Sequence, residues 1–180
     1  MNIIIIGGGS LCRLLIDIID SQPDIVATGI FDDRFPDLEE VAGVKVIGKF
    51  ADVSLEKSPN LVIGIGEPKI RKSIFEKYSA EGFHFPALIH SSAVVSKRSK
   101  ITNGVTIGPL STILSGSVIG EASCLLSLVN INQDVSVGCY SLIGASTAIG
   151  SGATLGEGCH VAMGKVIGPE ETIAPWIFTK

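Results

Sequence analysis

The chain of 180 residues is poor in charged and aromatic side chains, which make up 18% and 6% of it, and its net charge is −4. The few basic residues form no stripe, so neither nucleic acid nor an anionic membrane is expected as a partner. No uninterrupted apolar run reaches the roughly 18 residues that a membrane-spanning helix needs. The apolar run at residues 1–6 is too short for a signal peptide and lacks a basic leader. We therefore expect a cytoplasmic protein.

Cysteine is also scarce, and the cysteines are scattered. The four of them form no CxxC pair and have no histidine at the spacing of metal ligands: Cys12, Cys124, Cys139 and Cys159. Because a free cysteine behaves as a small buried hydrophobe, we expect reduced cysteines with a structural role. The sequence predicts neither a disulfide nor a metal site.

A register of six residues runs through the second half of the chain. From Val95 to Ile173 every sixth residue is Val, Leu or Ile without exception. Glycine often follows this aliphatic residue, where a corner needs either a positive φ or a close backbone approach, and at nine positions a small residue stands two positions before it. This pattern predicts a hexapeptide-repeat parallel β-helix, in which the aliphatic side chains form inward columns.

The first ninety residues alternate between strand and helix patterns. Strands are expected at 2–6, 25–31, 44–47, 61–65 and 83–89, and helices at 11–19 and 68–80, the second with Ile70, Ile74 and Tyr78 on one face. The β-branched run at 2–6 is typical of a strand buried on both faces of a parallel sheet. We predict two domains: a small Rossmann-like α/β domain at residues 1–90, and an all-β domain, the parallel β-helix, at 91–180.

A loop of small residues joins the first expected strand to the first helix, and it consists of Gly7, Gly8, Gly9 and Ser10. Bare backbone N–H groups at a helix N-terminus favour an anion, so the loop predicts a nucleotide or sugar-nucleotide phosphate site; a tight turn without a ligand is the alternative. Cys12 stands at the third glycine position of the dinucleotide fingerprint, which argues against an NAD site. Asp32 and Asp33 end the second strand, where they could bind a ribose or a base, or simply begin a turn.

The order of these features along the chain resembles the NeuD/PglD family of bacterial sugar acyltransferases. The likeness rests on the glycine loop, the pair Asp32-Asp33, residues 63–66 before a helix with Arg71, and residues 88–93 before the hexapeptides. It implies a left-handed β-helix, a homotrimer, acetyl-CoA as cosubstrate between neighbouring prisms, and a nucleotide-linked or free sugar as acceptor in surface-glycan biosynthesis. It also implies that the glycine loop, Asp32, Asp33 and Gly66 bind the acceptor.

The resemblance also shows where the chain departs from the family pattern. The family's general base is a histidine followed by an acidic residue, and the matching positions here are Gln133 and Asp134. An amide cannot take up a proton at neutral pH, so the expected base is absent. A second family histidine matches Leu142, and a histidine that often follows the family's glycines matches Leu11.

The end of the chain departs from the family as well. The usual C-terminal tail has no counterpart in residues 174–180, where Trp176 and Phe178 are expected to cover the last coil. Three hexapeptides make one coil, so Cys124, Leu142 and His160, which are eighteen residues apart, are expected in one column. His160 is therefore either a relocated base or an ordinary outward-facing histidine.

Three functional interpretations remain open at this point. The first is an acetyl-CoA-dependent acyltransferase acting on a sugar or nucleotide-linked amino sugar, with Gln133, Asp134 and His160 as candidate catalytic residues. The second is a catalytically impaired family member that serves as a trimeric sugar-nucleotide-binding or structural protein. The third is an enzyme of unrelated chemistry, since a fold does not fix a function.

Overall fold

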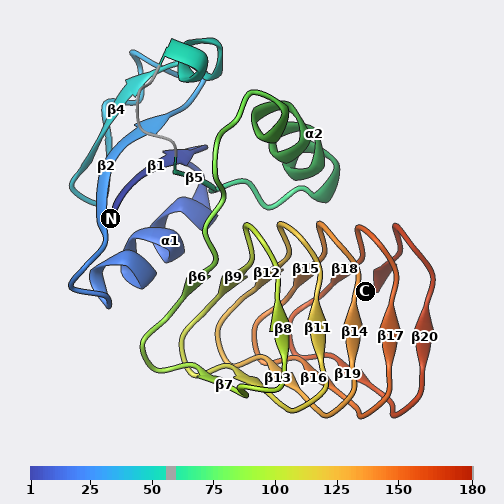
Figure 1. Ribbon diagram of the computed structural model, residues 1–180. Helices are drawn as coiled ribbons and strands as arrows, with labels where there is room; N and C mark the ends of the chain where they lie inside the picture. The colour runs from blue at the N-terminus through green and yellow to red at the C-terminus, as the bar shows by residue number, and fades with distance from the viewer. Residues whose placement is uncertain (56–59, 180) are drawn as a thin grey trace.

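The computed structural model describes residues 1–55 and 60–179, which form an α/β domain followed by a left-handed parallel β-helix (Figure 1). Lys180, the last residue of the C-terminal segment considered above, lies outside the described residues. The elements of the first domain are β1 (Asn2–Ile6), α1 (Ser10–Asp20), β2 (Val26–Phe31), β3 (Glu40–Val41), β4 (Val44–Gly48), the 3₁₀ helix η1 (Phe50–Leu55), β5 (Leu61–Ile63) and α2 (Pro68–Ala80).

The sheet of the first domain has the strand order β3-β4-β2-β1-β5 and is parallel except for β3, which runs antiparallel to β4. Ile3 and Ile5 of β1 pack with the apolar face of α1, whereas Ile4 and Ile6 pack with α2. Since successive side chains of a strand point to opposite faces, the two helices cover opposite faces of the sheet. The expected strand with two buried faces is thereby confirmed.

The β-helix is built from two-residue strands that recur every six residues. They are β6 (Leu88–Ile89), β7 (Val94–Val95), β8 (Lys100–Ile101), β9 (Thr106–Ile107), β10 (Thr112–Ile113), β11 (Val118–Ile119), β12 (Cys124–Leu125), β13 (Asn130–Ile131), β14 (Ser136–Val137), β15 (Leu142–Ile143), β16 (Ala148–Ile149), β17 (Thr154–Leu155), β18 (His160–Val161), β19 (Val166–Ile167), β20 (Thr172–Ile173) and β21 (Phe178–Thr179).

These strands stack into three parallel sheets, the three sides of a prism (Figure 1). We call the sheet β21-β18-β15-β12-β9-β6 the domain-facing side, because Leu11 of α1 packs with Cys124 and Leu142 of this sheet. Residues eighteen apart pair directly across neighbouring strands. Cys124 pairs with Leu142 and Leu142 with His160, which confirms the predicted column.

The prediction of a single strand at residues 83–89 in the first domain was wrong. His84 makes only an isolated bridge with Asn60, and Leu88–Ile89 pairs with β9 of the β-helix. Pro86 lacks the N–H that a continuous strand would need, and Ile89 already stands in the register of six, so its side chain packs against the β-helix core.

The glycines that follow the aliphatic positions are required by close packing between coils. A Cβ at Gly120 would lie 2.5 Å from the backbone nitrogen of Cys139. Positive φ angles fall instead three residues before the aliphatic position, as at Asp134 and Tyr140, so a positive φ is the wrong explanation for these glycines. Small residues two positions before the aliphatic one also join the coils, because the Ser117 hydroxyl donates to the Asn132 carbonyl.

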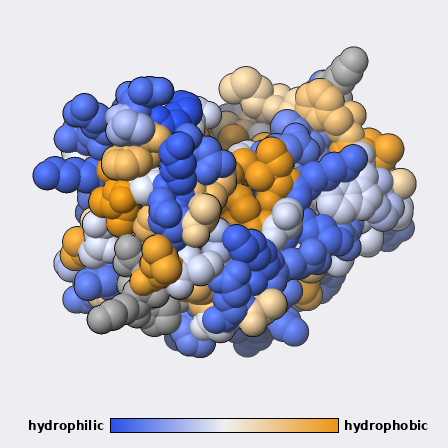
Figure 2. Space-filling model, turned by 90° about the horizontal axis from the view of Figure 1, so that it is seen from above, coloured by the Kyte–Doolittle hydropathy of each residue, from blue (hydrophilic) through white to orange (hydrophobic). Residues whose placement is uncertain are grey.

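The surface seen from above mixes hydrophilic and hydrophobic side chains, with the hydrophobic ones in separate patches (Figure 2). Within the described residues, no helix has the length and apolar character required to cross a bilayer. All four cysteines are free thiols, and Cys12, Cys124 and Cys159 are buried. Burial raises the pKa of the Cys124 thiol to about 11, which suits a packing role.

Candidate functional site

The glycine loop turns sharply between β1 and α1, and only some of its glycines are required by the fold. Gly7 has a φ of +97°, and a Cβ there would collide with Ile65. A Cβ at Gly8 would lie 2.8 Å from Leu38, whereas at Gly9 the nearest atom would be the Gly64 carbonyl oxygen at 3.9 Å. Packing therefore explains the first two glycines, and Gly9 is left free to admit a ligand close to the backbone.

A cavity of about 330 Å³ opens at this loop, and we call it the glycine-loop cavity. Its lining includes Gly7, Gly9, Ser10, Leu11, Asp32, Arg34 and Gly66. Helix α1 begins at its rim with no side-chain cap, so the first N–H groups and the positive end of the helix dipole are directed to the cavity. This arrangement, with the guanidinium of Arg34, favours an anion.

Asp32 holds the glycine loop and Arg34 in place. Its buried carboxylate accepts hydrogen bonds from the Gly8 N–H at 2.7 Å, the Arg34 N–H at 3.0 Å and the Arg34 Nε at 2.7 Å. Hydrogen bonds from Arg34 above all, and then from Gly8, hold the pKa of Asp32 far below its usual value. Asp33 accepts from the N–H of Phe50, at the start of η1. Both carboxylates thus have protein partners, and only Asp32 also lines the cavity.

Replacing Asp32 with Asn should destabilise the protein by about 1–2 kcal/mol at pH 7, because charge-assisted hydrogen bonds to a buried carboxylate are lost. A carboxyl with a lowered folded pKa stabilises fully above its unfolded pKa of about 3.9, and this contribution fades as the pH falls toward the folded value. Denaturant unfolding from pH 7 to pH 2 should therefore show the two curves converging in acid. The exposed Asp37→Asn is the control, and an equal loss in both variants would contradict this role.

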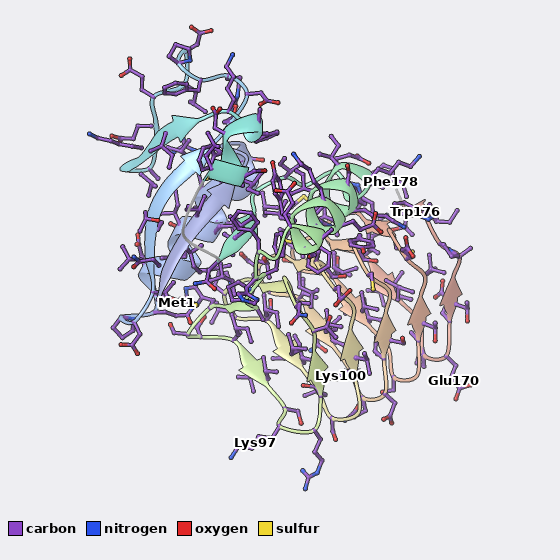
Figure 3. The ribbon with its side chains drawn as sticks, turned by 45° about the horizontal axis from the view of Figure 1, so that its top comes forward. Met1, Lys97, Lys100, Glu170, Trp176 and Phe178 are labelled. Carbon is purple, nitrogen blue, oxygen red and sulfur yellow. The ribbon has the colours of Figure 1, made fainter. Side chains whose placement is uncertain are left out.

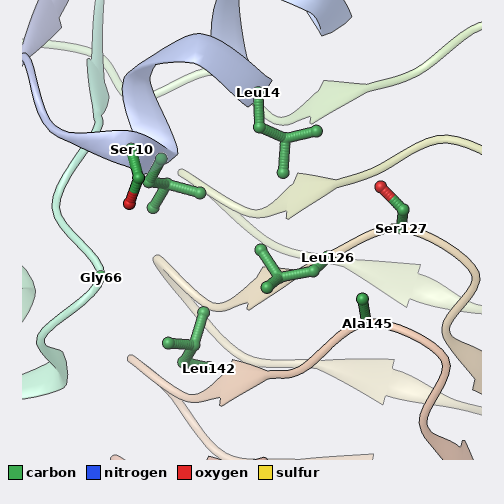
Figure 4. Close-up of a pocket in the computed structure, with 8 residues that line it drawn as sticks. Ser10, Leu14, Gly66, Leu126, Ser127, Leu142 and Ala145 are labelled. Carbon is green, nitrogen blue, oxygen red and sulfur yellow. The ribbon is translucent and has the colours of Figure 1, made fainter. Parts of the chain in front are cut away.

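A second cavity, of about 360 Å³, lies between α1 and the domain-facing side (Figure 4). We call it the apolar cavity, and its lining residues are Ser10, Leu11, Leu14, Gly66, Leu126, Ser127, Leu142 and Ala145. It shares Ser10, Leu11 and Gly66 with the glycine-loop cavity, so the two adjoin. Leu11 and Leu142, which match two family histidines, meet here against Cys124. The sequence identified each position separately but gave no sign that they share one cavity.

Arg71 of α2 joins the two domains at the edge of these cavities. Its buried guanidinium donates to the carbonyls of Ile65 and Gly66 at 3.1 and 3.2 Å, and to those of Tyr140 and Ser141 at 2.8 and 2.9 Å. Burial lowers the pKa of this group, yet arginine stays protonated in proteins. The sequence pattern missed this role because it placed Ile70 on the buried face, whereas Ile70 is 47% exposed.

Gln133 and Asp134 lie far from this cluster of cavities within one chain. They occupy the corner between β13 and β14, which is the prism edge opposite the domain-facing side. Both are exposed, and the Gln133 Oε1 accepts a hydrogen bond from the Ser151 hydroxyl at 3.1 Å. The NH₂ group of Gln133 donates no hydrogen bond to another described residue, so it is available to a ligand or to a neighbouring chain.

His160 lies on the domain-facing side, in a third cavity of about 230 Å³ that includes Glu67, Trp176 and Phe178. Trp176 and Phe178 lie near each other at the end of the β-helix (Figure 3), and the Phe178 ring is centred 4.6 Å from that of His160. Desolvation lowers the pKa of His160, against an opposing effect of Glu67, so the imidazole is neutral at pH 7. This cavity shares no lining residue with the apolar cavity, and His160 and Gln133 are not brought together.

No group of three or more His, Cys, Asp or Glu side chains that could hold a metal occurs in residues 1–55 and 60–179.

Comparisons with known proteins found one matching family model and several solved structures of similar fold. Residues 2–78 match the family described as the PglD N-terminal domain. PerB from Caulobacter crescentus, solved with CoA and GDP-perosamine, is similar at 25% identity with a TM-score of 0.79, covering 100% of this chain and 89% of that chain. A variant of that enzyme with a histidine replaced by alanine, also solved with CoA and GDP-perosamine, matches with a TM-score of 0.70 at 25% identity and the same coverage.

The acetyltransferase domain of PglB from Neisseria gonorrhoeae, solved with acetyl coenzyme A, shares the fold at 23% identity with a TM-score of 0.77. The match covers 96% of this chain and 95% of that domain. Both domains and their order are therefore common to this chain and the solved acetyltransferases.

Proposed function

We propose that the chain is a member of the NeuD/PglD family of bacterial sugar acyltransferases, and that it transfers an acyl group from acetyl-CoA or a related thioester to a nucleotide-linked amino sugar or a free sugar, in surface-glycan biosynthesis. The observation that carries this proposal is the contact between the two cavities at Ser10, Leu11 and Gly66. An anion-binding pocket there opens directly beside the β-helix, where relatives solved with CoA have the same fold.

The acceptor binds with its phosphates at the N-terminus of α1. The backbone N–H groups beyond Gly9 and the guanidinium of Arg34 supply hydrogen bonds and positive charge there. Asp32 contributes by fixing Arg34 and the loop, since its carboxylate is already occupied by protein donors.

Replacing Gly9 with Ser should leave the fold as stable or slightly more stable, because Ser is a good N-cap and α1 has no capping side chain. The same hydroxyl occupies the N–H groups that a phosphate needs, so we expect nucleotide-sugar affinity to fall at least about tenfold, as for a lost charge-assisted hydrogen bond. Calorimetric titration with a uridine diphosphate sugar measures the affinity.

The matched control for that variant is Gly8→Ser. Its new Cβ would lie 2.8 Å from Leu38, so this substitution should lower the melting temperature. Unchanged nucleotide-sugar affinity in the Gly9→Ser protein would contradict the anion site.

The chemistry is attack of the acceptor amine or hydroxyl on the thioester carbonyl. The C–N or C–O bond forms, the C–S bond breaks, the acceptor proton passes to a base or water, and CoA leaves as the thiol. Gln133 cannot take that proton, but its NH₂ can donate to the carbonyl oxygen, because its own oxygen is held by Ser151. An amine that arrives deprotonated needs no base, since proximity alone supplies a large rate factor.

We further propose that the working form is a homotrimer. Gln133 and Asp134 lie on the prism edge opposite the domain-facing side, so they reach an acceptor held at the glycine loop only if that loop belongs to a neighbouring chain. Light scattering of the purified protein tests this, with a mass of three chains expected.

His160 is the candidate base within the chain, since its imidazole is neutral at pH 7 and it lies one strand from Leu142. If it takes the acceptor proton, His160→Asn should lower the transfer rate by about 10² or more, with little effect on melting temperature. Phe178→Leu, which alters the same ring contact without removing a base, is the control. A transfer rate unchanged in His160→Asn would exclude this histidine as the base.

The second candidate function is a trimeric sugar-nucleotide-binding protein without turnover, favoured by the amide at Gln133 and the leucines at positions 11 and 142. The Caulobacter relative carries both ligands in a variant lacking a histidine, so binding there does not need that side chain. Thermal shifts with acetyl-CoA and with uridine or cytidine sugar nucleotides separate the two functions. Stabilisation by both supports the transferase, and stabilisation by the nucleotide sugar alone supports the binding protein.

A further inference from the structure

We propose that the apolar cavity holds the hydrocarbon chain of the acyl donor, and that the preferred donor carries an acyl group longer than acetyl. This inference rests on the proposed acyl transfer and names the donor class for it. The transfer itself is unchanged: the C–S bond of the thioester breaks, the new bond to the acceptor forms, and the acceptor proton passes through a base or water to the leaving thiolate.

The walls of the apolar cavity are hydrocarbon. Leu14, Leu126 and Leu142 face the same space in Figure 4, and Leu11 also lines the cavity. Its only side-chain polar groups are the hydroxyls of Ser10 and Ser127, neither of which is buried, and no lining residue can ionise. A sugar ring placed here would lose water from several hydroxyls without gaining partners, whereas an alkyl chain needs none. The lining therefore favours an acyl chain over the acceptor sugar.

The size of the cavity points to the same occupant. Its volume of about 360 Å³ is large for the methyl group of acetyl, since a single water occupies roughly 30 Å³ in the liquid. Unfilled apolar space forfeits dispersion contacts with its walls. A chain of four to six carbons would occupy the space that acetyl leaves empty.

The position of the cavity determines which way the acyl chain runs from the acceptor. Because Ser10, Leu11 and Gly66 line both cavities, the shared mouth lies where a phosphate-bound acceptor would present its reactive group. The four carbonyl contacts of Arg71 hold Gly66 against the domain-facing side, so this mouth is rigid. An acyl chain whose carbonyl stands at the mouth extends away from the acceptor, along Leu126 and Leu142.

The test compares the affinities of the full-length protein for S-ethyl-CoA, S-butyl-CoA and S-hexyl-CoA, stable thioethers that cannot transfer. Each buried CH₂ contributes about fourfold, so S-butyl-CoA should bind roughly 15-fold tighter than S-ethyl-CoA in calorimetry. Ser127→Trp should fill the cavity and abolish this preference. Met163→Trp is the matched control, because Met163 stacks one coil beyond Ala145 on the same corner, is 73% exposed and lies outside the lining.

Equal affinity for the ethyl and butyl thioethers in the unaltered protein overturns the chain pocket while leaving acetyl transfer in place. A butyl preference that survives Ser127→Trp, in a variant with an unchanged melting temperature, also overturns it. If no thioether binds while a nucleotide sugar does, the transferase proposal fails together with the acyl pocket.

Discussion

Replacing Arg71 with Met should lower the free energy of unfolding by about 3 kcal/mol or more. The guanidinium is buried and donates to four carbonyls, two on the loop before α2 and two on the β-helix. Hydrogen bonds to a charged donor contribute about 1.5–3 kcal/mol each, and the buried carbonyls left behind gain no replacement. Denaturant unfolding measures the loss, and hydrogen exchange at Ile65 and Gly66 should report local opening at the domain contact.

The matched control is Lys69→Met on the same helix, which removes an exposed charge and should change stability by no more than about 0.5 kcal/mol. Arg71→Lys is informative too, since one ammonium cannot reach both pairs of carbonyls as the planar guanidinium does. If Arg71→Met were as stable as Lys69→Met, the domain contact would not depend on this side chain.

Replacing Gln133 with His should raise the rate of acyl transfer by about 10²–10⁴, the range typical of a positioned general base. The gain should appear as the pH rises through about 6.5, because only the neutral imidazole accepts a proton. The measurement is kcat for thiol release across pH 5.5 to 8.5. Because Gln133 is exposed, a histidine in its place should not disturb the fold.

Gln133→Asn provides the control, since it keeps an amide and shortens the side chain. A Gln133→His rate no higher than that of the Asn variant, with no new pH dependence, would show that a histidine at position 133 does not act as a general base in this protein. The two outcomes distinguish an altered catalytic centre from a chain whose acceptor supplies its own deprotonated amine.

The β-helix could be predicted almost completely from the sequence, because its order is local and periodic. Each aliphatic residue of the register packs against its equivalents eighteen residues away, so one period fixes both the strand positions and their partners, as for Leu125 and Ile143. The start of the β-helix was missed because Ile89 belongs to the register but follows Pro86 in a stretch that also looks like a strand of the first domain.

The candidate site was harder to predict, because it depends on how the two domains dock. No local pattern brings Leu11 of α1 against Leu142 of the β-helix, or buries Arg71 in place of Ile70. The sequence likewise proposed Asp32 as a ligand for the acceptor, whereas the structure reveals its bonds to Gly8 and Arg34. Such contacts join residues remote in sequence, and the residue types alone do not specify them.

The proposed function is tested most directly by following the release of CoA thiol from acetyl-CoA and butanoyl-CoA in the presence of a panel of nucleotide-linked amino sugars. We expect release that requires both a thioester and one amino sugar, with an acylated sugar as the second product. Thiol release that is absent with every amino sugar, from folded protein that binds both ligands, would contradict acyl transfer and leave a binding protein.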